Sequence, residues 1–151
     1  MKFFSKILCV MLLLASLTAQ AQNVTVGLLA NMAADPEVTF KKLHDAGFKA
    51  CQTGYNGNWT QKDAERLKEL QVKYDLKIST LMYCTPNCRW NFTEGPSSIG
   101  LVPPLNRVKY LDMHKRAIDF CAMAGIPAFH SHFGFIPEEP TSELYVGFIQ
   151  V

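Results

Sequence analysis

The stretch IPAFHSHFGFIPE, residues 126–138, is the most informative part of this 151-residue sequence. It predicts a short buried strand that carries two histidines near its carboxyl end, followed by a Gly/Pro loop and a carboxylate. Because residues two apart in a strand share a face, His130 and His132 point one way while Phe129 and Phe133 point the other. Ligand sites of α/β folds and β/α barrels lie at the carboxyl ends of parallel strands, so the pair predicts a site. The alternative is that both imidazoles are hydrogen-bonded residues of the core or its rim.

A strand–helix unit repeats along the sequence before this stretch. Gly47 and Gly125 end two of the expected helices, and Asp35 and Thr60 are typical N-cap residues. Repeated units of this kind predict a parallel sheet with helices packed outside it. The expected strands cover residues 24–30, 48–53, 77–83 and the histidine-bearing segment, and the expected helices cover 36–46, a stretch capped by Thr60, 105–124 and a stretch capped by Thr141.

The number of units determines the expected fold class. An eight-unit TIM barrel has roughly 250 residues, whereas residues 22–151 hold four units. The expected fold is therefore α/β, a parallel (β/α) barrel of the TIM type, present as roughly the first four βα units, a half-barrel. A small doubly wound domain with an open four-stranded sheet is the alternative. The sequence stops soon after a fourth helix has begun, without a closing element, and we expect a truncated barrel.

The first residues predict a secretory signal peptide rather than part of the fold. Lys2 and Lys6 lie around the start of an apolar run at residues 7–17, and Ala19-Gln20-Ala21 is a small-x-small cleavage pattern. The run is too short to span a membrane, so residues 1–21 predict an exported protein, periplasmic or secreted, with no membrane attachment after cleavage. Without Lys2 and Lys6 the 15 basic residues fall to 13, equal to the 13 acidic ones. A neutral mature chain argues against nucleic acid as the partner.

Four cysteines remain after the predicted cleavage site. Cys84 and Cys88 are close enough in one loop to form a disulfide, and their redox state stays open. A structural zinc site would need two further ligands at known spacing, and the sequence offers no obvious pair. Cys51 lies in an expected strand and Cys121 in an expected helix, so we expect both to be buried thiols.

Several blocks resemble a known family. SIGLVPP at 98–104, AGIPA at 124–128 and HFGFIPE at 132–138 resemble the bacterial sugar phosphate isomerase/epimerase group of the xylose isomerase-like TIM barrel superfamily. The resemblance spans the mature chain but only the amino-terminal half of the family's barrel. It implies a carbohydrate isomerase or epimerase that transfers a proton on a sugar at a metal site. It also implies a divalent metal (Mn, Mg or Zn) held mostly by strands of the second half, so the metal ligands of this chain stay unknown.

The resemblance carries a short set of site residues onto this sequence. His132 and Glu138 are the candidates for catalysis. Aromatic rings offer faces against which a sugar can pack. The simpler interpretations are that Arg107 pairs with a carboxylate and that Trp59 shields a helix start. The expected substrate-binding residues at the mouth of the barrel are His130, His132, Arg107, Trp59 and Tyr83.

Other functions remain open at this point. A metal-dependent lyase or hydrolase acting on keto-sugars or keto-glycosides would share the fold, and so would an endonuclease, which the neutral charge disfavours. A non-catalytic carbohydrate-binding remnant is the alternative from another class. The expected partners are a small-molecule carbohydrate and, through open barrel edges, a second copy of the chain. We expect these residues alone to show little or no isomerase activity and to bind divalent metal weakly.

Overall fold

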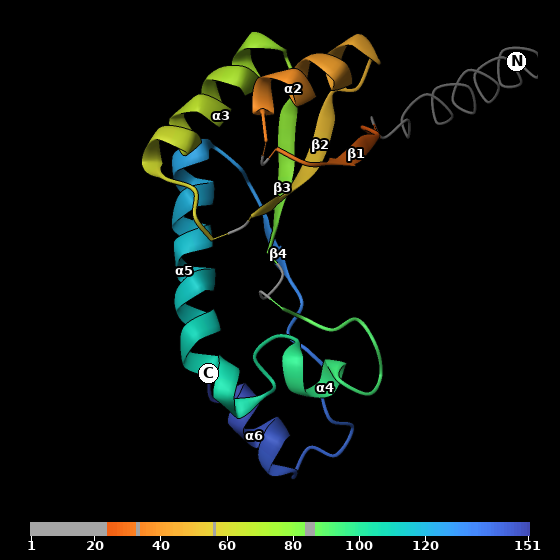
Figure 1. Cartoon of the computed structure of the whole chain (residues 1–151), viewed down its shortest axis with the longest axis vertical. Coiled ribbons are helices and arrows are strands. Elements are labelled where there is room, and N and C mark those ends of the chain that lie inside the picture. Colours follow the sequence, from red (N-terminus) through yellow and green to blue (C-terminus); the bar gives the residue numbers. More distant parts are fainter. Residues whose placement is uncertain (1–23, 33, 56, 84–86) are drawn as a thin grey trace, which may run out of the picture.

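Four parallel strands form one sheet in the order β1-β2-β3-β4. The computed structural model of the chain describes residues 24–32, 34–55, 57–83 and 87–151. The strands are β1 (Gly27–Ala30), β2 (Ala50–Tyr55), β3 (Lys77–Tyr83) and β4 (Phe129–Ser131). The helices are α2 (Pro36–Asp45), α3 (Gln61–Lys73), α4 (Gly95–Ser98), the 3₁₀ turn η1 (Pro104–Asn106), α5 (Arg107–Ala124) and α6 (Glu143–Ile149). The predicted repeat of βα units is confirmed (Figure 1).

Helix ends follow the local chemistry of the sequence. The Asp35 carboxylate accepts hydrogen bonds from two main-chain N–H groups at the start of α2. Thr60 and Asp63 form a reciprocal capping box at the start of α3, in which the Asp63 carboxylate accepts from the Thr60 N–H at 2.7 Å. Gly125 ends α5 in a left-handed conformation, with φ at +68°. These starts and stops were predicted correctly because a capping side chain satisfies main-chain groups a few residues away.

Some predicted boundaries are wrong. Ser142, not Thr141, caps α6: its hydroxyl accepts from the Tyr145 N–H at 3.2 Å. The Thr141 hydroxyl instead donates to the Glu139 carboxylate at 2.6 Å. The second strand starts at Ala50 and reaches Tyr55, two residues beyond the predicted end.

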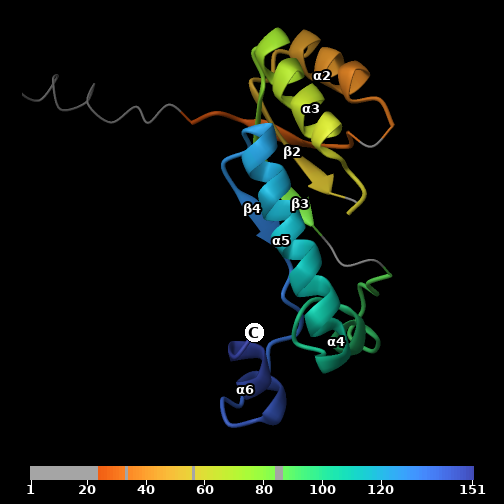
Figure 2. The same cartoon turned by 90° about the vertical axis from the view of Figure 1, so that its left-hand side faces the viewer.

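The core lies between the sheet and the helices α2, α3 and α5, which all pack on one face of the sheet (Figures 1 and 2). Strand residues facing these helices are buried, among them Cys51 and Leu81, each with no exposed area. Cys121 of α5 is buried as well, so both predicted buried thiols are confirmed. Burial raises the pKa of Cys51 and of Cys121 to about 11, and both are thiols at neutral pH.

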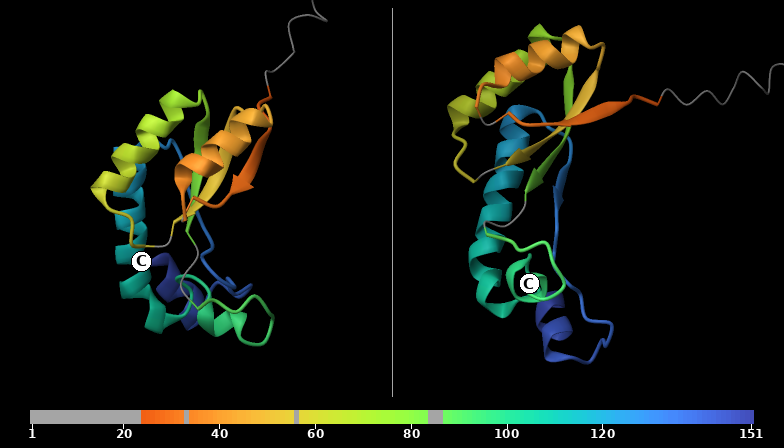
Figure 3. Two further views of the ribbon diagram at one scale, coloured as in Figure 1. Left: turned by 45° about the horizontal axis from the view of Figure 1, so that its top comes forward. Right: turned by 45° about the vertical axis from the view of Figure 1, so that its right-hand side comes forward.

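The opposite face of the sheet is what we call the inner face. In register across the strands it carries Leu29, Gln52, Thr80, Met82 and His130. No helix of the described residues covers it, and the Leu29 side chain is 68% exposed. In the right-hand view of Figure 3, α3 and α5 lie on one side of the strands, and α4 and α6 lie beyond the end of the sheet.

Two of the predictions fall outside the described residues. The proposed signal peptide, residues 1–21, is one, and the Cys84–Cys88 pair is the other, because Cys84 is not described. Within the described ranges, no helix is both long and apolar enough to cross a bilayer.

Candidate functional site

His130 of β4 and His132, one residue beyond the end of that strand, lie together, and the structure confirms which way they face. The ring centroids of His130 and His132 are 5.2 Å apart. His130 is exposed and His132 half-buried. Between them, the hydroxyl of Ser131 points the other way and lies 2.8 Å from Nε2 of His114 on α5. The two-residue alternation therefore holds, while a role for the pair in ligand binding stays a prediction.

An aromatic cavity of about 320 Å³ adjoins His132, and we call it the aromatic pocket. The ring of Trp90 meets His132 edge to face, with centroids 4.8 Å apart. Phe92 and Phe135 meet in the same way at 5.9 Å. Trp90 is 63% exposed and Phe92 is 90% exposed, so aromatic surface is open to solvent here. The pocket is lined by Trp90, Asn91, Phe92, Ile99, His132, Phe133, Gly134 and Phe135.

Two glycines allow the chain segments that build this pocket to cross. Gly100 has φ at +72°, and a Cβ there would lie 2.1 Å from the carbonyl carbon of Phe133. A Cβ on Gly134, with φ at +109°, would lie 2.4 Å from the carbonyl oxygen of Ile99. The crossing is fastened by the Phe133 carbonyl, which accepts from the Leu101 N–H at 2.8 Å and from the Val102 N–H at 3.1 Å. Backbone contact, rather than side-chain packing, sets the shape of this part of the pocket.

Behind the histidine pair, His114 holds β4 against α5. The Ser131 hydroxyl donates its single proton to the Tyr83 carbonyl at 3.1 Å, so the 2.8 Å contact with His114 requires the proton on Nε2 of that ring. The His114 ring also meets Phe129 and Phe133 edge to face. It is 5% exposed, and burial lowers its pKa from the ordinary value of 6.5. β4 is only three residues long, and this contact fixes the strand that carries the site.

The prediction that Tyr83 offers a ring face to a sugar is wrong. Tyr83 has no exposed area, and its hydroxyl donates to Sδ of Met113 on α5 at 2.9 Å. The cause is an extra residue in β3: Cys51 pairs with Ile78, but Gln52 pairs with Thr80, so Ser79 is inserted. Strict alternation from Ile78 would place Tyr83 on the inner face, whereas the bulge turns it toward the helices.

Arg107 also differs from its prediction. It is the first residue of α5 rather than part of a loop over the barrel mouth. Its guanidinium donates to the carbonyls of Leu101 at 3.1 Å, Val102 at 3.0 Å and Leu144 at 3.2 Å. The simpler interpretation, pairing with a carboxylate, is wrong as well. Arg107 fastens the segment before α5 and the helix α6, and its donors serve main-chain carbonyls rather than a substrate.

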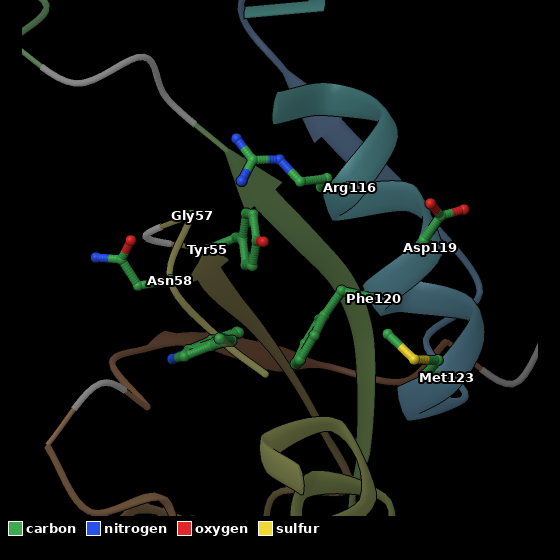
Figure 4. Close-up of a pocket in the computed structure, with 8 residues that line it drawn as sticks. Tyr55, Gly57, Asn58, Arg116, Asp119, Phe120 and Met123 are labelled. Carbon is green, nitrogen blue, oxygen red and sulfur yellow. The ribbon is translucent and has the colours of Figure 1, made fainter. Parts of the chain in front are cut away.

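Trp59 lies in a different cavity from His132, so the structure does not bring these two predicted substrate-binding residues together. Its ring packs against Phe120 of α5 and against Tyr55, with ring centroids 5.1 and 5.6 Å apart, so Trp59, in the loop after β2, lies against α5. This second cavity, of about 430 Å³, lies between α5 and that loop (Figure 4). The two cavities have no lining residue in common.

The described part of the chain contains no group of side chains that could form the predicted metal site by itself. Glu138 is exposed in the segment between β4 and α6. Among the described residues, no group of three or more His, Cys, Asp or Glu side chains is placed to hold a metal ion. Two imidazoles without a carboxylate do not match the oxygen ligands that Mg²⁺ and Mn²⁺ prefer, nor the three protein ligands of a catalytic zinc. The residues present do not fit a divalent metal site by themselves.

Sequence reasoning missed the aromatic pocket. Trp90, Asn91, Phe92 and Phe135 were not among the predicted site residues. The available signal was the long irregular stretch at residues 84–104, because long loops in compact domains commonly carry function. Which of its aromatic residues meet His132 depends on the loop crossing at Gly100, which no periodicity reveals.

Comparison with known proteins gives the fold. No protein-family model and no curated protein matches this sequence. A solved structure of a xylose isomerase domain protein from Planctomyces limnophilus matches with a TM-score of 0.74 at 20% identity, over 83% of this chain and 46% of that one. An AP endonuclease, family 2, from Brucella melitensis matches with a TM-score of 0.56 at 10% identity, over 84% of this chain and 49% of that one. The chain thus spans about half the length of each.

These matches define the class of protein by its architecture. The chain has the fold of half of a xylose isomerase-like TIM barrel, with a parallel four-stranded sheet and alternating helices. The predicted fold class is confirmed. At these identities the likeness concerns the fold, and function has to be argued from the site.

Proposed function

We propose that this chain supplies a carbohydrate-binding part of a xylose isomerase-like barrel that isomerises or epimerises a sugar. The observation that carries the proposal is the position of His132 beside the exposed ring of Trp90, in a cavity of about 320 Å³. A sugar ring has apolar C–H faces that pack on aromatic rings, and hydroxyl edges that need hydrogen-bond partners. The aromatic pocket offers both kinds of contact.

The polar groups of the pocket suit a neutral sugar better than a sugar phosphate. Among the described residues that line it there is no Lys or Arg, and His132 is the only ionisable side chain. Phosphate recognition relies on guanidinium, ammonium or clustered main-chain N–H groups. A neutral carbohydrate also agrees with the export predicted from residues 1–21, since phosphosugars are cytoplasmic metabolites.

The histidine pair is suited to moving protons. An imidazole ring can donate a proton from one nitrogen and accept one at the other. His132 would hydrogen-bond a substrate hydroxyl, and the ring centroid of His130 lies 5.2 Å from that of His132. Glu138 stays a candidate acid or base. A divalent metal, when bound, would polarise the carbonyl oxygen of the sugar. The described residues hold no group of three or more side chains placed to bind it, so further ligands would be needed.

Fluorescence of Trp90 tests the proposal directly. The chain has two tryptophans, so the Trp59→Phe variant leaves Trp90 as the sole reporter in the pocket. We expect a saturable change in its emission on titration with neutral aldoses and ketoses, and a response at least tenfold weaker to their phosphate esters. In the same background His132→Ala should weaken binding at least tenfold. His44→Ala is the matched control, because His44 is on α2 beside Asp45 and Tyr74.

The outcomes separate the candidate functions. The absence of a saturable response to any sugar, with the fold intact by circular dichroism, would contradict the proposal. Binding without turnover when Mn²⁺, Mg²⁺ or Zn²⁺ is added would favour a carbohydrate-binding protein, a function that the lack of a carboxylate cluster among the described residues supports. Formation of an unsaturated product from a keto-glycoside would assign the lyase reaction instead.

A further inference from the structure

We propose that the inner face of the sheet and its two open edges bind a second copy of this chain, so that two half-barrels close one eight-stranded barrel. The inference concerns the sheet rather than the aromatic pocket, and it does not depend on sugar binding.

Strand order and direction make this closure possible. The order β1-β2-β3-β4 leaves β1 at one edge and β4 at the other, and all pairings are parallel. A twofold axis along the barrel axis keeps the strand direction unchanged. It would pair β4 of each copy with β1 of the other in parallel, and two copies supply the eight strands of a TIM barrel. The contact is isologous and closed, with no further edge left for growth.

The exposed surface of β1 needs such a partner. Parallel sheets are normally covered on both faces, yet every residue of β1 except Ala30 is exposed. Leu29, on the inner face, is 68% exposed, and Val24 and Val26 just before the strand are 79% and 69% exposed. An apolar edge strand open to solvent is a template for pairing with another chain.

A second copy fits this surface because closure demands a specific shape. The occupant must bring four parallel strands with the same twist and tilt, and an inner face that interdigitates with this one. The chain itself has that shape, since it superimposes on half of a barrel protein that is about twice as long. Each copy would bring its own His130 and His132 to the common mouth, so the site would contain residues from both chains.

The test is the oligomeric state of the purified chain, measured by light scattering after size exclusion and by sedimentation over a range of concentrations. We expect a dimer with twice the monomer mass. Leu29→Lys places a charge inside the closed barrel, and because Leu29 is exposed in the single chain the substitution should not impair its folding. Val72→Lys is the matched control: Val72 is 81% exposed on α3, away from the sheet.

The expected result is a dimer whose dissociation constant rises at least tenfold in Leu29→Lys and is unchanged in Val72→Lys. Hydrogen exchange of the β1 amides should be slow in the dimer and fast in the Leu29→Lys variant. A chain that remains monomeric at every concentration would overturn the proposal, and so would a dimer that Leu29→Lys leaves intact with β1 amides unprotected. Sugar binding at Trp90 is read out separately, so the two proposals can fail independently.

Discussion

Replacing Gly100 by alanine tests whether the loop crossing is held by backbone contact. Gly100 and Gly125 share a left-handed conformation, with φ at +72° and +68°. A Cβ on Gly125 meets nothing within 4 Å, whereas a Cβ on Gly100 would lie 2.1 Å from the carbonyl carbon and 2.2 Å from the carbonyl oxygen of Phe133. Gly125→Ala therefore carries the conformational cost alone, and Gly100→Ala adds a clash with main chain, which cannot rotate away.

The magnitude follows from two contributions. A left-handed conformation costs an L-residue about 1–2 kcal/mol, and this is the whole expected loss for Gly125→Ala. In Gly100→Ala the segments must also separate, which removes the two hydrogen bonds that the Phe133 carbonyl accepts, each worth about 0.5–1.5 kcal/mol. The expected loss in the free energy of unfolding is then about 2–5 kcal/mol for Gly100→Ala.

Urea unfolding followed by circular dichroism measures both variants under the same conditions. We expect Gly100→Ala to lose more free energy than Gly125→Ala and to shift the emission of Trp90, because the crossing shapes the pocket that this ring lines. Equal losses in the two variants, or an unchanged Trp90 emission in Gly100→Ala, would refute the argument that backbone contact at the crossing builds the pocket.

Two further predictions concern the groups that hold the site in place. Because burial lowers the pKa of His114, the stability that depends on its neutral form is present above pH 6.5, the ordinary value, and declines as the pH falls through the lowered pKa. His114→Gln keeps a donor for Ser131 and should flatten this part of the pH dependence; an unchanged profile in urea unfolding between pH 5 and 7.5 would contradict it. Arg107→Met should speed hydrogen exchange in α6, which has no buried residue. Arg116→Met, which removes the ion pair with Asp112 one turn earlier in α5, should not.

The sequence was sufficient for features determined by neighbouring residues. Asp35, Thr60 and Gly125 mark helix ends through contacts within a few positions, and those ends were predicted correctly. The facing of His130 and His132 follows from the geometry of a regular strand, so it too could be read from spacing. The number and order of βα units then led to the half-barrel.

The predictions of site residues were wrong where contacts between distant parts of the chain determine the position of a side chain. The inserted Ser79 reverses the facing of Tyr83, because an inserted residue shifts the alternation of every residue after it. Arg107 is held by the carbonyl of Leu144, 37 positions further along the chain. Trp90 meets His132 only because two loops cross. None of these contacts between distant residues can be read from the composition of the sequence.

The position of the site on the least regular part of the chain has a physical reason. β4 has three residues and, within the described part of the chain, pairs with β3 alone, so strand hydrogen bonds alone would hold His130 and the adjoining His132 loosely. The contact from Ser131 to His114 and the fastening of the Phe133 carbonyl to Leu101 and Val102 supply the missing constraint from either side. A ligand that packs on Trp90 would meet a histidine whose strand is fixed by α5 and whose loop is fixed by the crossing. Closure of β4 against β1 of a second copy would add the remaining backbone constraint, and His130 would then lie on a strand paired along both edges.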